Sequence, residues 1–212
     1  LIPAMLAVCT LDCTATLLHA ADFTFHKTLT ASGTVNLNVC NNSGLIHVAG
    51  VAGSSVQISA DIHKNNWHSM ASTDDMKNVA ANPPIHQTSS GIHVGDTSTC
   101  GANVLHNIDI DYEISVPKNA TLVVKSNSGT IHVNSITGFV HAGTGSGDVF
   151  VNGIGTNSWL ATSSGNLDIQ GAHGTLLAKI GAGNLNIHDS DVTDALLELG
   201  SGNITATNLK GG

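Results

Sequence analysis

The sequence predicts an all-β protein, a parallel β-solenoid with coils of about 18 residues, two short strands per coil, and one irregular insertion with a short helix. Three observations predict it. A Ser-Gly or Ala-Gly pair recurs at a nearly constant spacing, apolar residues alternate on both sides of these glycines, and aromatic residues make up only 3% of 212 residues. A thin core between two sheets has room for Val, Ile, Leu, Ala and Ser but little for aromatic rings.

The repeat is clearest in the segments NSGTIHV, GSGDVFV, SSGNLDI, GAGNLNI and GSGNITA. Apolar residues follow each glycine at the second and fourth positions, as Val149 and Val151 do, and others precede it by five and seven. This period of two buries one face of each strand, and stacking equivalent strands about 4.8 Å apart builds two parallel sheets. We predict that the chain turns at a corner at each of these glycines and at an earlier equivalent: Gly44, Gly129, Gly147, Gly165, Gly183 and Gly202.

The corner residues themselves could suggest a ligand site. GTGSGDVFV (143–151) is glycine-rich like a phosphate-binding loop, but it leads into a strand instead of a helix and has Asp148 where such a loop needs a cation. One carboxylate among the stacked corners is also too few for a calcium repeat. We therefore predict a structural ladder of side-chain hydrogen bonds along the residues that follow the glycines: Thr130, Asp148, Asn166, Asn184 and Asn203.

The chain divides into a leader and one domain. Residues 1–21 are predicted to be a truncated signal peptide, because an apolar run ends in small residues at which cleavage could occur. Lipidation at Cys9 and a buried first strand are the alternatives. Residues 22–212 form a single β-solenoid domain with regular coils over 118–212, which we expect to continue beyond the C-terminus.

An insertion over residues 63–107 interrupts the repeat. It contains a predicted helix from about Thr73 to Ala81, preceded by Ser72 and Asp75 in the arrangement of a capping box. If the leader is removed, Cys40 and Cys100 are the remaining cysteines, and an exported protein most simply pairs them. Such a disulfide would tie the insertion to the early coil, and two free buried thiols are the alternative.

Charge and histidine content exclude several partners. The formal net charge is −8 and all seven basic residues are Lys, so we expect no nucleic-acid partner. The 12 His residues include His47, His93 and His132 in three separate IHV triplets. Neither these nor the cysteines have the spacing of a metal site, and we expect no metal and no cofactor.

The segments VAANPPIHQTSSGIHVG (79–95) and IDYEISVPKNATLVVKSNSGTIHV (110–133), with the TGSGDVFVNGI-type coils that follow, resemble the bacterial putative adhesin domains. These are exported domains of uncharacterised function, related to the head domains of surface adhesins. The resemblance covers about residues 22–212 and implies a β-solenoid fold and an envelope location. It supplies no catalytic residues, and this chain departs from the family in having no Arg.

One outward ladder of the predicted solenoid is apolar and forms our candidate contact surface. It lies six residues before the corner glycines and comprises Val123, His141, Trp159, Leu177 and Leu196. Contiguous exposed apolar residues typically form interaction sites, and Trp is enriched at binding hot spots. The alternative is that the insertion, or a missing part of the chain, covers this stripe.

These observations favour a non-enzymatic, exported protein of the periplasm, outer membrane surface or extracellular space. We expect an adhesin-like binding or structural module whose partner is a protein or a glycan, with end-to-end or lateral self-association. The alternative is a carbohydrate-active enzyme, for which paired carboxylates are needed. The candidates are Asp109 with Asp111, or Asp189, Asp191 and Asp194.

Overall fold

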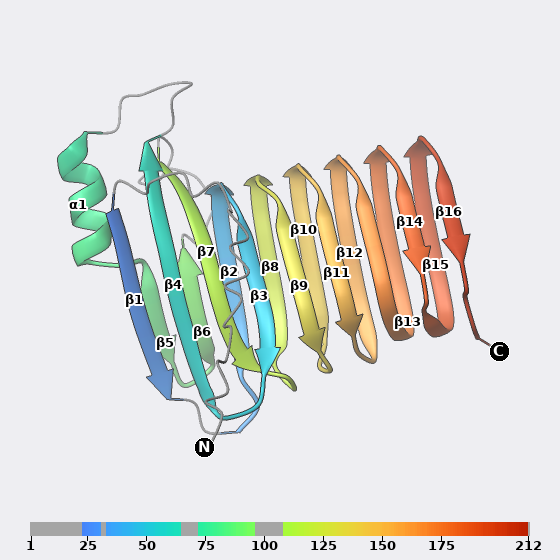
Figure 1. The fold of residues 1–212 in the computed structure, drawn as a ribbon, viewed down its shortest axis with the longest axis horizontal. Coiled ribbons are helices and arrows are strands. Elements are labelled where there is room, and N and C mark those ends of the chain that lie inside the picture. The colour runs from blue at the N-terminus through green and yellow to red at the C-terminus, as the bar shows by residue number, and fades with distance from the viewer. Residues whose placement is uncertain (1–22, 31–32, 65–71, 96–107, 212) are drawn as a thin grey trace, which may run out of the picture.

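The computed structural model describes residues 23–30, 33–64, 72–95 and 108–211. Within these ranges the protein is mostly β-strand with one helix, which confirms the predicted all-β class with a short helix (Figure 1). The predicted signal peptide (1–21) and Cys100 lie outside them. The described part contains no helix of the length and apolarity that crossing a membrane requires.

The elements follow one another along the chain as sixteen strands and a helix within the described ranges. They are β1 (Phe23–Thr30), β2 (Asn36–Ser43), β3 (Ile46–Val51), β4 (Ser55–Lys64), α1 (Thr73–Ala81), β5 (Ile85–Thr88), β6 (Gly91–Gly95), β7 (Ile108–Pro117), β8 (Thr121–Ser128), β9 (Ile131–Ile136), β10 (Val140–Ser146), β11 (Val149–Ile154), β12 (Asn157–Ser164), β13 (Leu167–Ala182), β14 (Leu185–His188), β15 (Asp191–Ser201) and β16 (Ile204–Thr207).

From β8 onward, strands of successive repeats pair in parallel. One series runs β8, β10, β12, β13, β15, and the other runs β9, β11, β13, β14, β16. The 16-residue β13 belongs to both series, so the two form one continuous 16-stranded sheet with β1 and β5 at its ends. Figure 1 shows these strands stacked along the long axis of the molecule.

The sheet is mixed, which departs from the all-parallel pairing expected for residues 22–212. β4 pairs antiparallel with both β1 and β7, and β5 pairs antiparallel with β6. In the β5–β6 hairpin the reason is local, because a two-residue connection reverses the chain and places consecutive strands side by side. The antiparallel pairs all lie at the N-terminal end of the stack, next to α1.

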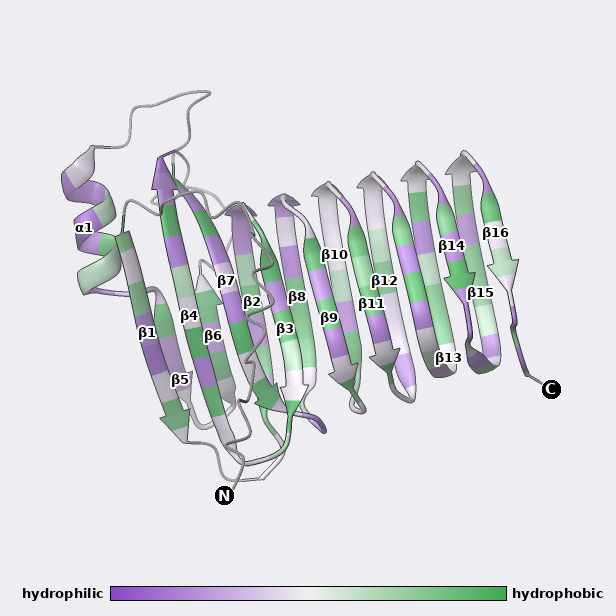
Figure 2. Ribbon diagram, viewed as in Figure 1, coloured by the Kyte–Doolittle hydropathy of each residue, from purple (hydrophilic) through white to green (hydrophobic). Residues whose placement is uncertain are grey.

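The core is one continuous cluster that receives alternate side chains from both strand series. Val149, Val151, Leu167 and Ile169, placed inward by the period-2 pattern, are all at most 3% exposed. Hydrophobic and hydrophilic bands alternate along the strands accordingly (Figure 2).

The N-terminal end of the core is closed by different side chains. Phe25 and Tyr112 pack edge to face with ring centroids 6.3 Å apart, and α1 packs on β1 and β4 with Met76 and Val79 buried. The helix begins and ends where predicted, and its capping box is confirmed. Ser72 Oγ accepts a hydrogen bond from the Asp75 N–H, while the Asp75 carboxylate accepts one from the Ser72 N–H.

The corner glycines are required by close packing between coils. Gly165 and Gly183 have φ of +152° and +146°, and a Cβ on either would collide with the carbonyl oxygen of the corner glycine in the preceding coil. A Cβ at Gly44, Gly129, Gly147 or Gly202 would also collide with a backbone oxygen. Of these four, Gly129 has no positive φ.

The predicted ladder of corner side chains is confirmed for its last four members. Asn166 donates to Asp148 Oδ1 through its backbone N–H (2.7 Å) and its side chain (3.1 Å). Asn184 does the same to Asn166, and Asn203 to Asn184, at 3.0–3.3 Å. Each rung thus supports the next coil.

A second corner lies six residues after each of the last five corner glycines. Its residues all have φ between +52° and +68° and are Ser135, Gly153, Gly171, Asp189 and Asn208. Gly, Asn and Asp tolerate this left-handed conformation best, so the residue types at this offset were a usable signal.

Candidate contact surface

The five stripe residues lie in register on the outer face of the β8 series. His141 pairs with Val123 on one side and Trp159 on the other, and Leu177 pairs with Trp159 and Leu196. The strands place them here because Leu122, Val140 and Leu176 occupy the neighbouring inward positions. Trp159 is 42% exposed and Leu196 is 56% exposed. The sequence-predicted stripe is therefore contiguous in space.

The centre of the stripe is a stacked pair of rings. The His141 and Trp159 rings lie 4.2 Å apart between centroids and only 7° from parallel. Partial burial lowers the pKa of His141, and the nearby Lys125 cation lowers it further. The lowered pKa favours the uncharged imidazole, which suits an apolar partner at the centre of this surface.

Small and charged residues line one side of the stripe. Two residues further along each strand stand Lys125, Gly143, Ala161, Lys179 and Glu198, which are also in register. Lys179 Nζ lies 2.8 Å from Glu198 Oε2. On the other side, Phe139 is 38% exposed. The surface is consequently apolar along its middle and charged at its margin.

The described part of the insertion lies beside the stripe series. β6 pairs with the edge of β2, extending the sheet beyond β8, and α1 packs on β1 and β4. Cys40 is buried in β2 and is disulfide-bonded. Because Cys100 lies outside the described residues, the Cys40–Cys100 pairing stays a prediction.

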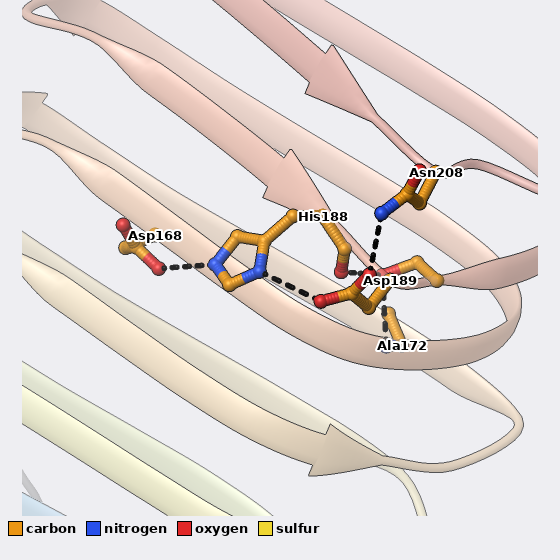
Figure 3. Close-up of polar contacts among 6 residues, drawn as sticks. Asp168, Ala172, His188, Asp189 and Asn208 are labelled. Atoms are coloured by element: carbon orange, nitrogen blue, oxygen red, sulfur yellow. Dashed lines mark hydrogen bonds and ion pairs between the residues drawn. The ribbon is translucent and has the colours of Figure 1, made fainter.

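The opposite outer face carries polar clusters. In Figure 3, His188 on β14 lies between two carboxylates, with Nε2 3.2 Å from Asp168 Oδ1 and Nδ1 3.4 Å from Asp189 Oδ2. The contact with Asp168, followed by those with Asp189, raises the pKa of His188. Asn208 donates to Asp189 Oδ1 at 2.9 Å, which is the first cause of a lowered pKa at Asp189.

Of the carboxylates named as enzyme candidates, Asp109, Asp111 and Asp189 accept hydrogen bonds near corners. The Asp109 side chain accepts a hydrogen bond from Ser43 Oγ. Asp111 Oδ1 accepts one from the Leu45 N–H at 2.6 Å, while its other oxygen lies 3.4 Å from His63. Asp189 belongs to the cluster above. Asp191 and Asp194 are exposed on β15.

The contact between His47 and His132 was not predicted from the sequence, because the two residues are far apart in the chain. They are register partners in β3 and β9 with ring centroids 6.1 Å apart, and His47 Nδ1 lies 2.7 Å from Glu113 Oε2. Their shared position, three residues after Gly44 and Gly129, was the signal that could have paired them. Among the described residues, no three His, Cys, Asp or Glu side chains are placed to hold a metal ion.

Comparison with known proteins gives a likeness of fold. No protein-family model matches the sequence, and a search of curated proteins finds no similar sequence. A solved structure of a "putative cell adhesion protein" from Clostridium sporogenes has a TM-score of 0.51 and 12% identity over 88% of this chain and 100% of its own. At this identity the likeness shows a shared fold.

Two further solved structures are similar at lower scores. One is a "putative adhesin" from Bacteroides fragilis, with a TM-score of 0.41 and 12% identity over 87% of this chain and 96% of its own. The other is a "putative adhesin" from Parabacteroides distasonis, with a TM-score of 0.29 and 10% identity over 89% of this chain and 97% of its own.

Proposed function

We propose that this chain is a non-enzymatic, exported cell-envelope protein that works as an adhesin-like binding module. Residues 118–212 would form its β-solenoid, and the stripe from Val123 to Leu196 its contact surface. The observation that carries the proposal is the register of the stripe, which aligns five mostly apolar side chains on an outer face and leaves Trp159 and Leu196 exposed. Exposed contiguous apolar surface of this kind is costly in water unless a partner covers it.

The fold supports the adhesin-like part of the proposal. The Clostridium sporogenes protein, called a "putative cell adhesion protein", shares the fold over its whole length. The family resemblance of residues 22–212 points the same way and would place the protein in the envelope. Parallel pairing of equivalent repeats from β8 onward supports classing this part as a solenoid.

No observation favours the enzyme alternative. Asp109 and Asp111 hold neighbouring corner groups in hydrogen bonds, and Asp189 is held by Asn208 and His188. Catalysis on a glycan needs two carboxylates facing one substrate site, with one free to exchange a proton. Turnover on a panel of polysaccharides that disappears with Asp109→Asn would overturn the non-enzymatic assignment.

The binding proposal is tested with labelled protein and intact bacterial cells, alongside an array of immobilised glycans. Trp159→Ala combined with Leu177→Ser should abolish binding, because it removes the central ring and its apolar neighbour. Phe150→Ala is the matched control, because Phe150 is an exposed aromatic (36%) on the opposite outer face. Circular dichroism should be unchanged in both. Binding that survives the double substitution, or that is lost with Phe150→Ala, would move the contact surface elsewhere.

A further inference from the structure

We propose that the contact surface docks against a second copy of the chain, face to face, about a two-fold axis that runs along β12. This deepens the proposed function, on whose contact surface it rests, by naming the partner. The inference comes from the order of side chains across the five strands of the β8 series.

The apolar stripe has its largest side chain at its centre. Trp159 has two rungs on either side: His141 and Val123 toward β8, Leu177 and Leu196 toward β15. A two-fold axis along β12 reverses the order of the strands in the facing copy while keeping each strand's direction. Trp159 would then meet its own copy, while His141 would meet Leu177, and Val123 would meet Leu196. Each rung thus meets an apolar or uncharged side chain.

The row of residues from Lys125 to Glu198 that lines one side of the stripe is here called the marginal row. Its charges are complementary to those of the second copy under the same two-fold operation. Lys125 on β8 would face Glu198 of the second copy, because the two residues stand in the same row, two strands on either side of β12. The operation repeats the pair, so one interface contains it twice. Isologous interfaces have this reciprocity, and a charge pair that is matched twice favours one docking geometry over others.

Gly143 provides the space that this geometry needs. The operation places Lys179 of the second copy over Gly143, which lies between Lys125 and Ala161 in the marginal row. A Cβ at Gly143 would make only ordinary contacts with Ala161, at 3.6 and 3.9 Å, so packing within the chain does not demand a glycine. Glycine within a strand weakens it, and is typical of places where another group approaches closely.

The alternative in-plane two-fold axis, along the stack, fits less well. It would place each strand against the same strand of the second copy, running in the opposite direction. A residue on one side of the stripe would then face the residue on the other side. Glu198 would then face Asp194 of the second copy, which brings two carboxylates together, and Lys125 would face the uncharged Thr121. Like charges across an interface are unfavourable, so the charges select the axis along β12.

The size of the surface predicts a weak dimer. Five strands at about 4.8 Å spacing span only about 20 Å, which is at the small end for a stable interface of about 800 Å² per partner. Association should therefore appear at micromolar or higher protein concentration and strengthen at low salt, where the charge pairs are less screened.

The test is sedimentation equilibrium on the full chain over a range of concentrations. Wild type should be a monomer–dimer mixture, and Lys125→Glu or Glu198→Lys alone should raise the dimer Kd about tenfold or more. An equimolar mixture of the two variants should form a heterodimer with Kd within about threefold of wild type, since both charge pairs are then restored. Lys118→Glu, an exposed charge reversal in the turn before β8, is the control and should leave Kd unchanged.

Each failure has a distinct meaning. A wild type that stays monomeric at all concentrations, or a mixture no tighter than the single variants, would overturn the two-fold dimer. If the dimer is absent while Trp159→Ala with Leu177→Ser still abolishes binding to cells, the proposed function stands with a different partner. If the dimer forms as described and that double variant still binds cells, the surface serves self-association and the proposed binding function fails.

Discussion

The two ends of the strand stack bury their apolar residues to very different degrees. At the N-terminal end, antiparallel strands and α1 cover the core, and Ile62, Ile108 and Ile110 are at most 1% exposed. At the other end, Ile204 on β16 is 44% exposed, although its partner Leu185 one coil earlier is fully buried. Position within the repeat therefore does not decide burial alone, because the next coil also covers each residue.

Stability in this fold is therefore a sum of contacts between neighbouring coils. An inner coil contacts two others, while β15 and β16 contact one, so the same substitution should cost more inside the stack than at its end. The N-terminal end avoids that loss by a change of construction, since Met76 and Val79 from α1 and the Phe25–Tyr112 pair replace the repeat.

The largest effect is expected at an inner corner. Gly165→Ala should lower the free energy of unfolding by about 4 kcal/mol, because it combines an unfavourable positive φ with a collision against the Gly147 carbonyl oxygen. Gly143→Ala is the matched control in a strand and should change it by less than about 1 kcal/mol. Urea unfolding measures both, and equal effects would show that the corners are not packed as described.

The two ends are compared directly by truncating one apolar side chain at each. Met76→Ala should cost about 3 kcal/mol because Met76 is 3% exposed under the helix, whereas Ile204→Ala should cost less than about 1 kcal/mol. Thermal unfolding of the two variants beside wild type provides the measurement. A larger loss for Ile204→Ala would mean that the β16 end is covered in solution.

A smaller effect is expected in the corner ladder. Asn184→Ala should cost about 1 kcal/mol, because Asn184 both donates to Asn166 and accepts from Asn203. Asn184→Asp keeps the accepting oxygen and should recover part of the loss. Asp148, the first member of the bonded ladder, already accepts in this way from Asn166. Chemical denaturation that finds both variants equal would assign the ladder no energetic role.

The smallest effect is a dependence on pH at His188. Its pKa is raised in the folded state, so its stabilising contribution is fully present below its usual pKa of 6.5 and is lost as the pH rises through the folded value. The stability difference between wild type and His188→Gln should therefore shrink from pH 6 to pH 8. His132 and His141 act oppositely, since burial, the leading cause, lowers both pKa values. NMR titration should place the pKa of His188 above 6.5, and Asp168→Asn should lower it.

The sequence predicted what repeats and missed what does not. The corners, inward strand positions, ladder and stripe each lie at a fixed offset from the glycines. The structure places each of them at its offset. The capping box located α1 because its signal is local. β1 was not predicted, since among its eight residues only Phe25 is buried and its alternation is faint. Likewise, the antiparallel pairing of β4 with β7 depends on contacts between distant segments, which no local pattern encodes.

The polar clusters were also not predicted, because they too depend on contacts between distant segments. His188 with Asp168, and His47 with Glu113, are joined across coils, so only the register of the strands reveals them. The stripe was accessible to sequence reasoning because all five members share one repeat position, although the stacking of His141 on Trp159 was not foreseen.

The most direct test of the contact surface is oxidative footprinting of Trp159. The protein is compared when bound to intact bacterial cells and when free at a concentration too low for self-association. Trp159 is 42% exposed when free, so it should oxidise readily and become strongly protected on binding, while Phe150 on the opposite face keeps its reactivity. Unchanged oxidation of Trp159 in the bound protein, with protection at Phe150 instead, would show that the contact surface is not the stripe.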